Sequence, residues 1–381
     1  MLDKKLKIGI TCYPTYGGSG VLATELGVAL AKKGHEIHFI TSSLPYRLSK
    51  GFQDNLYFHP VEMMDYPLFG QSPYAVVLSA KMAEVFRNES LDLIHVHYAI
   101  PHATSAILAR DMVLPKKMPI VTTLHGTDIT LVGKDPSFSE ITKYSIEKSD
   151  FVTTVSDYMT KTTYEQFDLT KKIHRIYNFV DTKIFDTLDG EKPCSEAHFG
   201  FKGETVFIHI SNFREVKRPL DVLHIFNNVH KANSDTKLLL VGDGPLYSQC
   251  RKQVKEYGLL DHVRFLGKQE DVVSILHMSH VMLFPSEIES FGLAPLEAMA
   301  CGIPVIASNS GGVPEVVKHG ECGYLADVGD IETMSKYAIE LSNDCQKRDE
   351  MGAKGRQIAE KHFSPEQIVS EYEEIYRQAI I

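Results

Sequence analysis

The chain has 381 residues, 43% of them hydrophobic and 23% charged, with a formal net charge of −9. This length favours two domains, and the composition excludes disordered and fibrous classes. The negative charge argues against nucleic acid or an anionic membrane as main partner, and without a signal peptide or an apolar run of ~18 residues we expect a cytoplasmic protein.

The first part of the chain alternates strand and helix patterns. A short strand is predicted at 6–11, followed by a glycine-rich loop from Tyr16 to Gly20 and a helix with leucines at helical spacing. Such alternation predicts a parallel sheet covered on both faces. The further strands are predicted at 36–41, 56–61, 92–97, 120–124, 151–155 and 173–177, and helical patterns include 75–87 and 142–148.

A second series of alternating strand and helix patterns follows residues 178–203. Those residues show no sustained hydrophobic periodicity and are interpreted as the interdomain connection. We therefore expect an α/β fold with two doubly wound, Rossmann-like domains, residues 1–180 and 203–364, facing each other across a cleft. The helical pattern at 365–381 is expected to pack back on the first domain. In the second series, strands are predicted at 205–210, 237–241, 263–266, 281–284 and 304–307, and helices at 219–231 and 246–257.

Two glutamates mark the segment 285–306. We expect Glu289 in a loop and Glu297 about two turns into a helix with mostly small or apolar neighbours. The N-terminus of that helix favours a phosphate, and carboxylates beside it suit the vicinal hydroxyls of a sugar. A simple helix cap remains an alternative for Glu289, whereas burial makes a purely structural Glu297 costly.

Cations follow the strand at 205–210, in the sequence Asn212-Phe213-Arg214-Glu215-Val216-Lys217-Arg218. Arg214 and Lys217 are interpreted as a clamp for a pyrophosphate, because their different shapes grip different oxygens. Fixed cations would stabilise a leaving diphosphate as it gains charge. Arg218 is interpreted as a surface residue.

The first domain offers a glycine loop and a strand-end histidine. Gly18-Ser19-Gly20-Val21-Leu22-Ala23 matches a dinucleotide-binding pattern, but the second strand ends in Thr41-Ser42-Ser43 without the acidic residue that holds a ribose. A phosphate or acceptor anion therefore remains the favoured ligand of this loop. His125 ends its strand and is a candidate functional residue, Tyr98 closes the neighbouring strand, and His95 and His97 are interpreted as packed or supporting residues.

The 6 cysteines and 17 histidines show no C-x-x-C or H-E-x-x-H pattern, and no Asp-x-Asp occurs. These spacings predict neither a disulfide framework nor a zinc site, and they disfavour a transferase with a carboxylate-held metal. We therefore expect no metal and no cofactor.

Several segments together resemble the retaining glycosyltransferases of family 4, which have the GT-B fold. The resemblance is carried by ESFGLAPLEAMACGIPVIA with its Glu289-x7-Glu297 pair, the first glycine loop, the Lys217 segment and Gly311-Gly312-Val313-Pro314-Glu315. It implies that Glu297 holds the uridine ribose, Glu289 contacts the donor sugar and Lys217 contacts the diphosphate. The residues so assigned to catalysis are His125, Glu289, Lys217 and Arg214, and those assigned to the donor are Gly18, Ser19, Asn212, Phe291, Gly292, Leu293 and Glu297.

One position departs from that family. Its usual arginine is Asn212 here, and Arg214 is expected to substitute for it. The resemblance further implies retention of configuration by displacement on one face, with the departing phosphate oxygen taking the acceptor's proton.

The segments CYPTYGGSGVLATELG, LHGTDITLVG and SNFREVKRP resemble the branch of the family that opens bacillithiol biosynthesis. This resemblance implies UDP-GlcNAc as donor and L-malate as acceptor, and a homo-oligomer is possible. Ser19, Tyr98, Thr127 and Lys143 are the candidates for binding malate, with Arg47 in reserve. The alternatives are another acceptor (an inositol phosphate, a lipid or a glycan) and a non-catalytic nucleotide-sugar-binding protein.

Overall fold

The computed structural model describes residues 4–14, 18–45, 48, 54–63, 73–187 and 203–381. The chain divides into two compact units. Unit 1 comprises Met1–Asn178 and Pro365–Ile381, and unit 2 comprises Phe179–Ser364. Part of the predicted connection, 188–202, lies outside the described residues, and residues 179–187 belong to unit 2.

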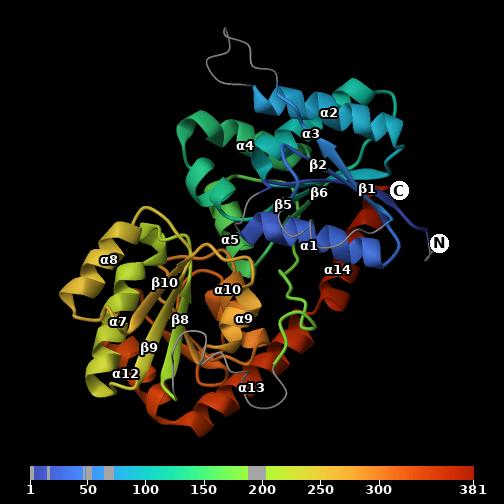
Figure 1. The fold of residues 1–381 in the computed structure, drawn as a ribbon. Coiled ribbons are helices and arrows are strands. Elements are labelled where there is room, and N and C mark those ends of the chain that lie inside the picture. The colour runs from blue at the N-terminus through green and yellow to red at the C-terminus, as the bar shows by residue number, and fades with distance from the viewer. Residues whose placement is uncertain (1–3, 15–17, 46–47, 49–53, 64–72, 188–202) are drawn as a thin grey trace. The chain divides into compact units, whose positions relative to one another are not determined.

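Unit 1 contains, within its described residues, a parallel seven-stranded sheet of order β3-β2-β1-β4-β5-β6-β7 (Figure 1). Its central strands are buried along their whole length, as expected where helices cover both faces. The strand order reverses between β1 and β4, which is where doubly wound sheets bind ligands. The strands are β1 (Lys7–Thr11), β2 (Glu36–Thr41), β3 (Leu56–Pro60), β4 (Leu93–His97), β5 (Ile120–Leu124), β6 (Phe151–Thr154) and β7 (Ile173–Arg175).

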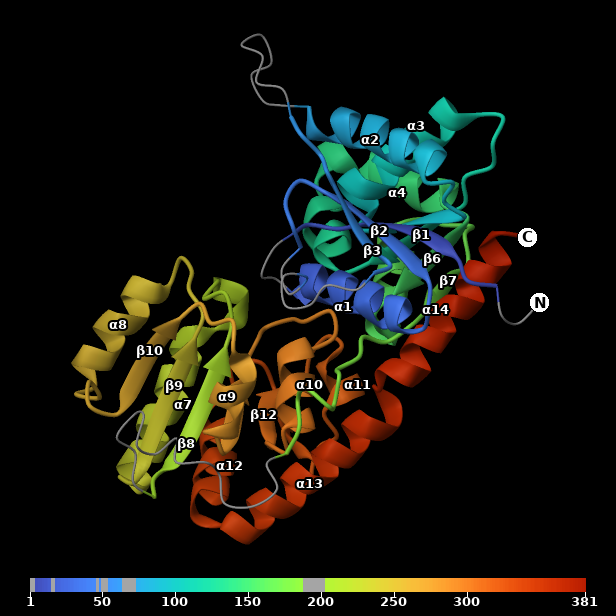
Figure 2. The same cartoon turned by 45° about the vertical axis from the view of Figure 1, so that its right-hand side comes forward.

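Helices lie on both faces of this sheet. Figures 1 and 2 show α2 and α3 on one face and α1 and α14 on the other. A core cluster joins α2 and α3 to β4, with Phe86, Ile94 and Val96 fully buried. The helices are α1 (Gly18–Lys32), α2 (Tyr74–Asn88), α3 (Thr104–Val113), α4 (Pro136–Lys148), α5 (Asp157–Gln166) and α14 (Pro365–Ala379), and two short π-helical turns are η2 (Ala99–Ala103) and η3 (Asp128–Val132).

Helix α14 packs on unit 1, beside α1 and over β5. It buries one apolar face, and Tyr376 is among the largest fully buried side chains. The phenol of Tyr376 hydrogen-bonds with Nδ1 of His95 at 2.7 Å. Glu373 forms an ion pair with Lys33, directly after α1, and hydrogen-bonds with Nε2 of His35 at 3.0 Å. The helix therefore combines apolar burial with charged contacts along its length.

Unit 2 contains, in its described part, a parallel six-stranded sheet of order β10-β9-β8-β11-β12-β13. Its order reverses between β8 and β11. The strands are β8 (Thr205–Ile210), β9 (Thr236–Val241), β10 (Val263–Gly267), β11 (Val281–Phe284), β12 (Val305–Ser308) and β13 (Gly323–Ala326). The helices are α7 (Pro219–Ala232), α8 (Tyr247–Glu256), α9 (Val272–His277), α10 (Leu293–Ala300), α11 (Val313–Val316), α12 (Ile331–Asn343) and α13 (Cys345–His362), with a short 3-10 helix, η4 (Glu215–Lys217).

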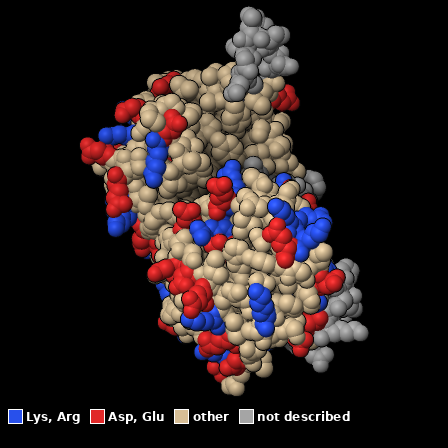
Figure 3. Space-filling view, turned by 90° about the vertical axis from the view of Figure 1, so that its left-hand side faces the viewer, with Lys and Arg blue, Asp and Glu red and all other residues tan. Residues whose placement is uncertain are grey.

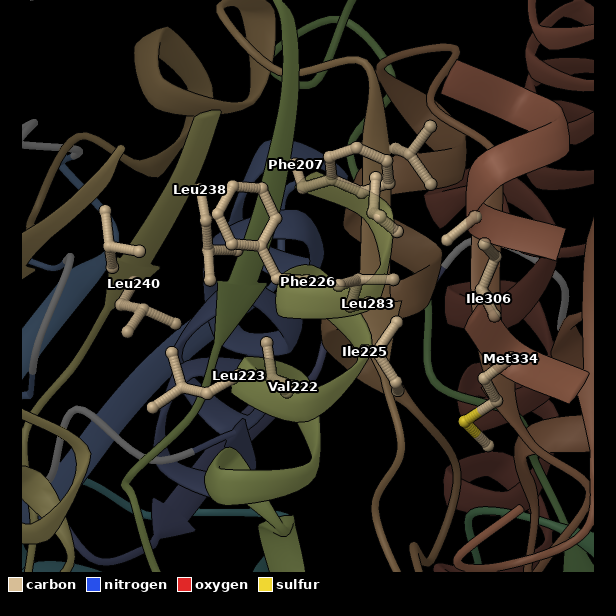
Figure 4. Packing of buried hydrophobic residues seen from close by; sticks show 14 of the residues in the cluster. Phe207, Val222, Leu223, Ile225, Phe226, Leu238, Leu240, Leu283, Ile306 and Met334 are labelled. Carbon is tan, nitrogen blue, oxygen red and sulfur yellow. The ribbon is translucent and has the colours of Figure 1, made fainter. Parts of the chain in front are cut away.

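The core of unit 2 lies between the sheet and helices α7 and α12 (Figure 4). Phe226 of α7 meets Phe207 of β8 edge to face, with ring centroids 6.1 Å apart. Met334 of α12 extends toward Ile306 of β12. Burying each such side chain stabilises the fold by roughly 1.5–3 kcal/mol. This packing holds the strands whose carboxyl ends carry the candidate site.

The fold class predicted from the alternating pattern is confirmed. The strands predicted at 36–41, 120–124, 205–210 and 281–284 have those bounds in the structure. One local prediction is wrong, because Gly18, Ser19 and Gly20 form the first turn of α1 rather than a loop. Tyr16 and Gly17 of the predicted loop lie outside the described residues.

Charged side chains of both signs are spread over the surface that Figure 3 shows. On the face in Figure 3, basic and acidic side chains alternate instead of forming one continuous basic field. Among the helices that the structure describes, none is long and apolar enough to cross a membrane.

Candidate active site

Three segments meet at the carboxyl edge of the sheet in unit 2. Residues 211–218 follow β8, residues 285–292 follow β11 and residues 309–312 follow β12, and these three strands are neighbours. The register therefore places the predicted cations and the predicted loop glutamate together.

Lys217 and Glu289 form an ion pair, with Nζ 2.6 Å from Oε1. The lysine side chain is 22% exposed and the glutamate side chain 13%, so both remain partly accessible to a ligand. An ammonium group has three donors and a carboxylate has two oxygens, so each partner keeps hydrogen-bonding capacity beyond this contact. A simple helix cap does not describe Glu289, because α10 begins at Leu293 with Gly292 as its cap residue.

The two other cations of the segment differ from Lys217. Arg214 is exposed and precedes η4, so it is open to solvent. Arg218 pairs with Asp221, with Nε 2.6 Å from Oδ2. The prediction that Arg218 is not part of a ligand clamp agrees with this local pairing.

Two glycines after β12, Gly311 and Gly312, pack closely against the backbone of the loop that carries Glu289, here called the glutamate loop. The amide of Gly312 donates to the carbonyl of Glu289 at 2.8 Å. Gly311 has φ +62°, and a Cβ added there would lie 2.2 Å from the same carbonyl oxygen. A Cβ at Gly312 would lie 2.4 Å from the carbonyl oxygen of Ser290. Only glycine permits this close approach, which fixes the position of Glu289.

Helix α10 presents its N-terminus at the same edge. Gly292 has φ +106°, and Phe291 is buried with its ring 5.7 Å from that of Phe363. Leu293 carries an amide in the first helical turn, where backbone donors lack partners within the helix. Glu297 is buried, with 8% exposure, as predicted, but it lies little more than one turn into the helix instead of two.

The buried side chain of His209 hydrogen-bonds with Ser211, at the start of the segment that carries Arg214 and Lys217. Nδ1 of His209 donates to the carbonyl of Leu283 at 2.9 Å, so Nε2 accepts from the hydroxyl of Ser211 at 2.8 Å. The hydroxyl of Ser211 in turn accepts from the amide of Phe213. Burial lowers the pKa of His209 to about 4, which keeps the ring neutral. Asn212 in this loop is exposed.

In unit 1 the carboxyl ends of β1, β4 and β5 form the corresponding edge. The phenol of Tyr98 donates to the hydroxyl of Ser19 in the first turn of α1 at 2.8 Å. The Tyr98 ring lies 5.2 Å from that of His125. Burial raises the pKa of Tyr98 to about 12, so its hydroxyl keeps its proton. The structure thus brings together three predicted residues from different elements.

His125 is paired with a second histidine. Its Nε2 lies 2.8 Å from Nδ1 of His97, and the two rings stack with centroids 5.0 Å apart. Burial lowers the pKa of His125 to about 3 and lowers that of His97 well below its usual value. Both rings are therefore neutral near pH 7.

Asp128 fixes the turn that carries His125. Its Oδ1 accepts from the amides of His125 and Gly126, at 3.2 and 2.9 Å, and its Oδ2 accepts from the amide of Ala99 at 3.1 Å. Burial raises the pKa of Asp128 to about 6, against the opposing effect of these amides. The carboxyl group ties the ends of β4 and β5 to each other.

Three further predicted residues of unit 1, Gly18, Thr127 and Lys143, belong to its described part. Gly18 begins α1, and Thr127 is exposed just before η3. Lys143 lies on α4, which packs against η2 and η3, and it makes no hydrogen bond or ion pair with any described residue. Arg47 lies outside the described residues.

Three residues of the site were not predicted as functional: His97, Asp128 and His209. His97 was interpreted as a supporting residue, and its i, i+2 spacing from His95 on a buried strand was the available signal. Asp128 follows His125 by three residues, a spacing that allows its carboxylate to cap the turn. Within the described residues no group of three or more His, Cys, Asp or Glu side chains is arranged to hold a metal ion.

Comparison with known proteins shows the family of the chain. Residues 16–184 match the family model described as Glycosyltransferase Family 4, and residues 195–358 match the one described as Glycosyl transferases group 1. The N-acetyl-alpha-D-glucosaminyl L-malate synthase of Bacillus anthracis is 49% identical over 98% of this chain and 97% of its own.

Solved structures show the same fold. A glycosyltransferase from Rickettsia africae superposes with a TM-score of 0.82 at 20% identity, covering 99% of both chains. Anabaena HepE in complex with UDP-glucose superposes with a TM-score of 0.80 at 19% identity, covering 98% of this chain and 100% of its own. The chain therefore belongs to the glycosyltransferases, with a Family 4 region followed by a group 1 region on the GT-B fold.

Proposed function

We propose that this protein transfers N-acetylglucosamine from UDP-GlcNAc to the hydroxyl group of L-malate, with retention of configuration and without a metal ion. The observation that carries the proposal is the 49% identity, over 98% of the chain, to an enzyme named for this product. Through the resemblance described above, the reaction would be the first step of bacillithiol biosynthesis.

The donor is assigned mainly to unit 2, and Gly18 and Ser19 of unit 1 would add to its contacts. Lys217 would use the donors not engaged by Glu289 to bind the diphosphate, and Arg214 would add a second cation from its exposed position. Glu289 would accept from a sugar hydroxyl, and Glu297 from the ribose. The amides of Phe291, Gly292 and Leu293 would contact the sugar or the diphosphate, as the start of a helix favours.

The acceptor is assigned to unit 1. Ser19 and Tyr98 already share a hydrogen bond, and both can reorient toward a carboxylate of malate. Thr127 adds a third hydroxyl, and Lys143 supplies the cation that a dicarboxylate requires. In the proposed reaction, the bond between the sugar C1 and the diphosphate oxygen breaks, the malate oxygen bonds to C1 on the same face, and its proton passes to the departing phosphate.

The decisive experiment incubates the purified protein with UDP-GlcNAc and L-malate and measures UDP release. The proposal expects malate-dependent release and a product whose anomeric proton shows the same α coupling as the donor, with no loss of rate in EDTA. Release with an inositol phosphate, a glycan or a lipid acceptor, but not with malate, overturns the acceptor. An inverted product overturns retention, and loss of rate restored by a divalent ion overturns metal independence.

A further inference from the structure

We propose that His97 is a positioning residue that fixes the tautomer of His125, so that Nδ1 of His125 carries the ring proton and donates toward a ligand. The identity of the ligand that accepts this hydrogen bond rests on the proposed function, whereas the assignment of the tautomer does not. The inference makes His125 a hydrogen-bond donor in the reaction instead of a base.

The contact between the two rings admits two arrangements. The 2.8 Å separation of His97 Nδ1 and His125 Nε2 is a hydrogen bond, and a bond between neutral imidazoles needs one protonated and one bare nitrogen. Burial keeps both rings neutral, as the lowered pKa values of His97 and His125 indicate. Either His97 donates to His125, or His125 donates to His97.

The second nitrogen of His97 decides between them. Nε2 of His97 is buried and has no hydrogen-bond partner among the described residues. If His125 donated, this nitrogen would carry a buried N–H group without a partner, which proteins rarely tolerate. If His97 donates from Nδ1, its Nε2 carries no proton. Nε2 is then a buried acceptor without a partner, which costs less than a buried N–H group without one. His97 is therefore the donor.

The consequence for His125 follows from the chemistry of imidazole. Its Nε2 accepts the hydrogen bond, so the single proton of the neutral ring resides on Nδ1. Nδ1 of His125 has no hydrogen-bond partner within the described part of the chain, and the residue is only partly buried. This N–H group is therefore available to an oxygen of a substrate, and it cannot at the same time accept that substrate's proton.

The surroundings of His97 hold its ring in place. The ring of His95 lies 4.5 Å from that of His97. Both nitrogens of His95 are hydrogen-bonded, Nδ1 with Tyr376 and Nε2 with Thr123. The carbonyl of His97 accepts from Nδ1 of His102. These contacts hold the ring of His95 and the backbone of His97, and the ring of His97 itself contacts the rings of His95 and His125.

The test is a two-bond proton–nitrogen NMR spectrum of the protein labelled with ¹⁵N-histidine, recorded without substrates at pH 7.5. We expect His125, assigned by loss of its signals in His125→Gln, to be protonated at Nδ1. In His97→Phe, which keeps an aromatic ring but removes the donor, we expect the Nε2–H form of His125 to become populated. His174→Phe, on β7 of the same sheet, should leave the signals of His125 unchanged.

Two results overturn the inference: a wild-type His125 protonated at Nε2, or a His97→Phe protein in which His125 keeps its proton on Nδ1. If His97→Phe does not fold, His97→Leu, which also removes the donor, replaces it with the same expected result. His97→Asn, whose amide can restore a donor near the Nδ1 position, should retain the Nδ1–H form of His125. In turnover, His97→Phe should lower kcat about tenfold, the effect of one misplaced hydrogen bond, with little change in KM for the donor. Because the spectra need no substrate, failure of malate as acceptor would leave this inference standing.

Discussion

In the proposed function, binding of the donor depends on the ion pair of Lys217 and Glu289. Lys217→Ala would leave the carboxylate of Glu289, with its side chain 13% exposed, without its cation and would remove a ligand of the diphosphate. We expect kcat/KM to fall by about 10²–10³, as for the loss of one preorganised charge in other active sites. Steady-state kinetics with UDP-GlcNAc and malate measure the effect.

Arg218→Ala is the matched control, since Arg218 adjoins Lys217 but pairs with Asp221. It should retain most of the activity. The double variant Lys217→Ala with Glu289→Gln should lose less than the sum of the two single losses, because the partners act as a pair. Full additivity would contradict a coupled role.

Lys143 is the residue assigned to a carboxylate of malate. Lys143→Ala should raise KM for malate about tenfold or more while leaving KM for UDP-GlcNAc unchanged, because only the acceptor loses a cation. Lys148→Ala is the control on the same helix, where the lysine lies over the ring of Tyr144 instead. An unchanged dependence on malate would remove Lys143 from the acceptor site.

Asp128 should give a pH signature of its own. Its pKa in the folded protein, about 6, is above the ordinary value of 3.8, so its contribution to stability is complete below pH 3.8 and is lost as the pH rises through 6. The free energy of unfolding of wild type minus that of Asp128→Asn should therefore fall by roughly 2–3 kcal/mol between pH 4 and pH 7. Urea unfolding at several pH values measures it.

Asp135 supplies the contrasting control for that series. It caps α4, and its hydrogen bonds from Ser137 lower its pKa. Its contribution is therefore present above the ordinary pKa and is lost only on further acidification, so Asp135→Asn should show no slope between pH 4 and pH 7. A common slope for both variants would refute the assignment to Asp128.

The sequence predicted individual residues of the site better than the contacts between them. Glu289 and Lys217 could be chosen by charge and by position after a strand, but their ion pair depends on β8 and β11 being neighbours. The pairing of His97 and His125 similarly depends on the register that sets His97 opposite Thr123. Patterns in one chain give strand order and register only indirectly, so these contacts required the fold.

At the scale of elements, the glutamate loop depends on the glycines that follow β12. Gly311→Ala would place a Cβ 2.2 Å from the carbonyl oxygen of Glu289 at a residue with φ +62°. The loop would have to move, and we expect kcat/KM to fall by about two orders of magnitude, as a shift of 1 Å in a catalytic group causes. The same kinetic assay reports this change.

Gly320→Ala separates the clash from the cost of the backbone conformation. Gly320 has φ +79°, and nothing lies within 4 Å of a Cβ added there. Both alanine variants should lose about 1–2 kcal/mol of stability from the left-handed conformation, but only Gly311→Ala should lose activity. Equal activity of the two variants would mean that the loop does not depend on the close approach at Gly311.

Elements were predicted most reliably where burial and periodicity agree. The strand at 120–124 is a continuous apolar or β-branched run, the strand at 205–210 is one except for His209, and the bounds of both were predicted correctly. The start of α1 was not, because three residues of Gly and Ser read as a loop by propensity although they form a helical turn in the fold. Strand β13 (Gly323–Ala326) was not predicted, because two of its four residues, Gly323 and Ala326, are of types that strands disfavour.

At the scale of the whole molecule, acid should affect the two units unequally. Among the described residues, desolvation strongly lowers the pKa values of His95, His97, His102 and His125 in unit 1, and of His209 in unit 2. A lowered pKa in the folded state means that stability is complete above the ordinary value of 6.5 and declines as the pH falls below it. Each such histidine costs up to ~1.4 kcal/mol per pH unit.

Amide hydrogen exchange between pH 7.5 and pH 5, corrected for the intrinsic pH dependence of exchange, measures this difference. Protection in β4 and β5 should fall well before protection in β8 and β11. Equal loss in both sheets, or earlier loss in unit 2, would contradict the assignment of acid sensitivity to the buried histidines of unit 1.

Helix α14 affects folding during translation, because it belongs to unit 1 but follows unit 2 in the sequence. During translation the segment Phe179–Ser364 leaves the ribosome before α14 does. While unit 2 is being synthesised, the sheet face of unit 1 beside β5 and His95 therefore lacks the helix that covers it in the folded protein. Unit 1 begins first in the chain but completes its fold last, and until then the apolar surface that α14 covers is exposed and prone to aggregation.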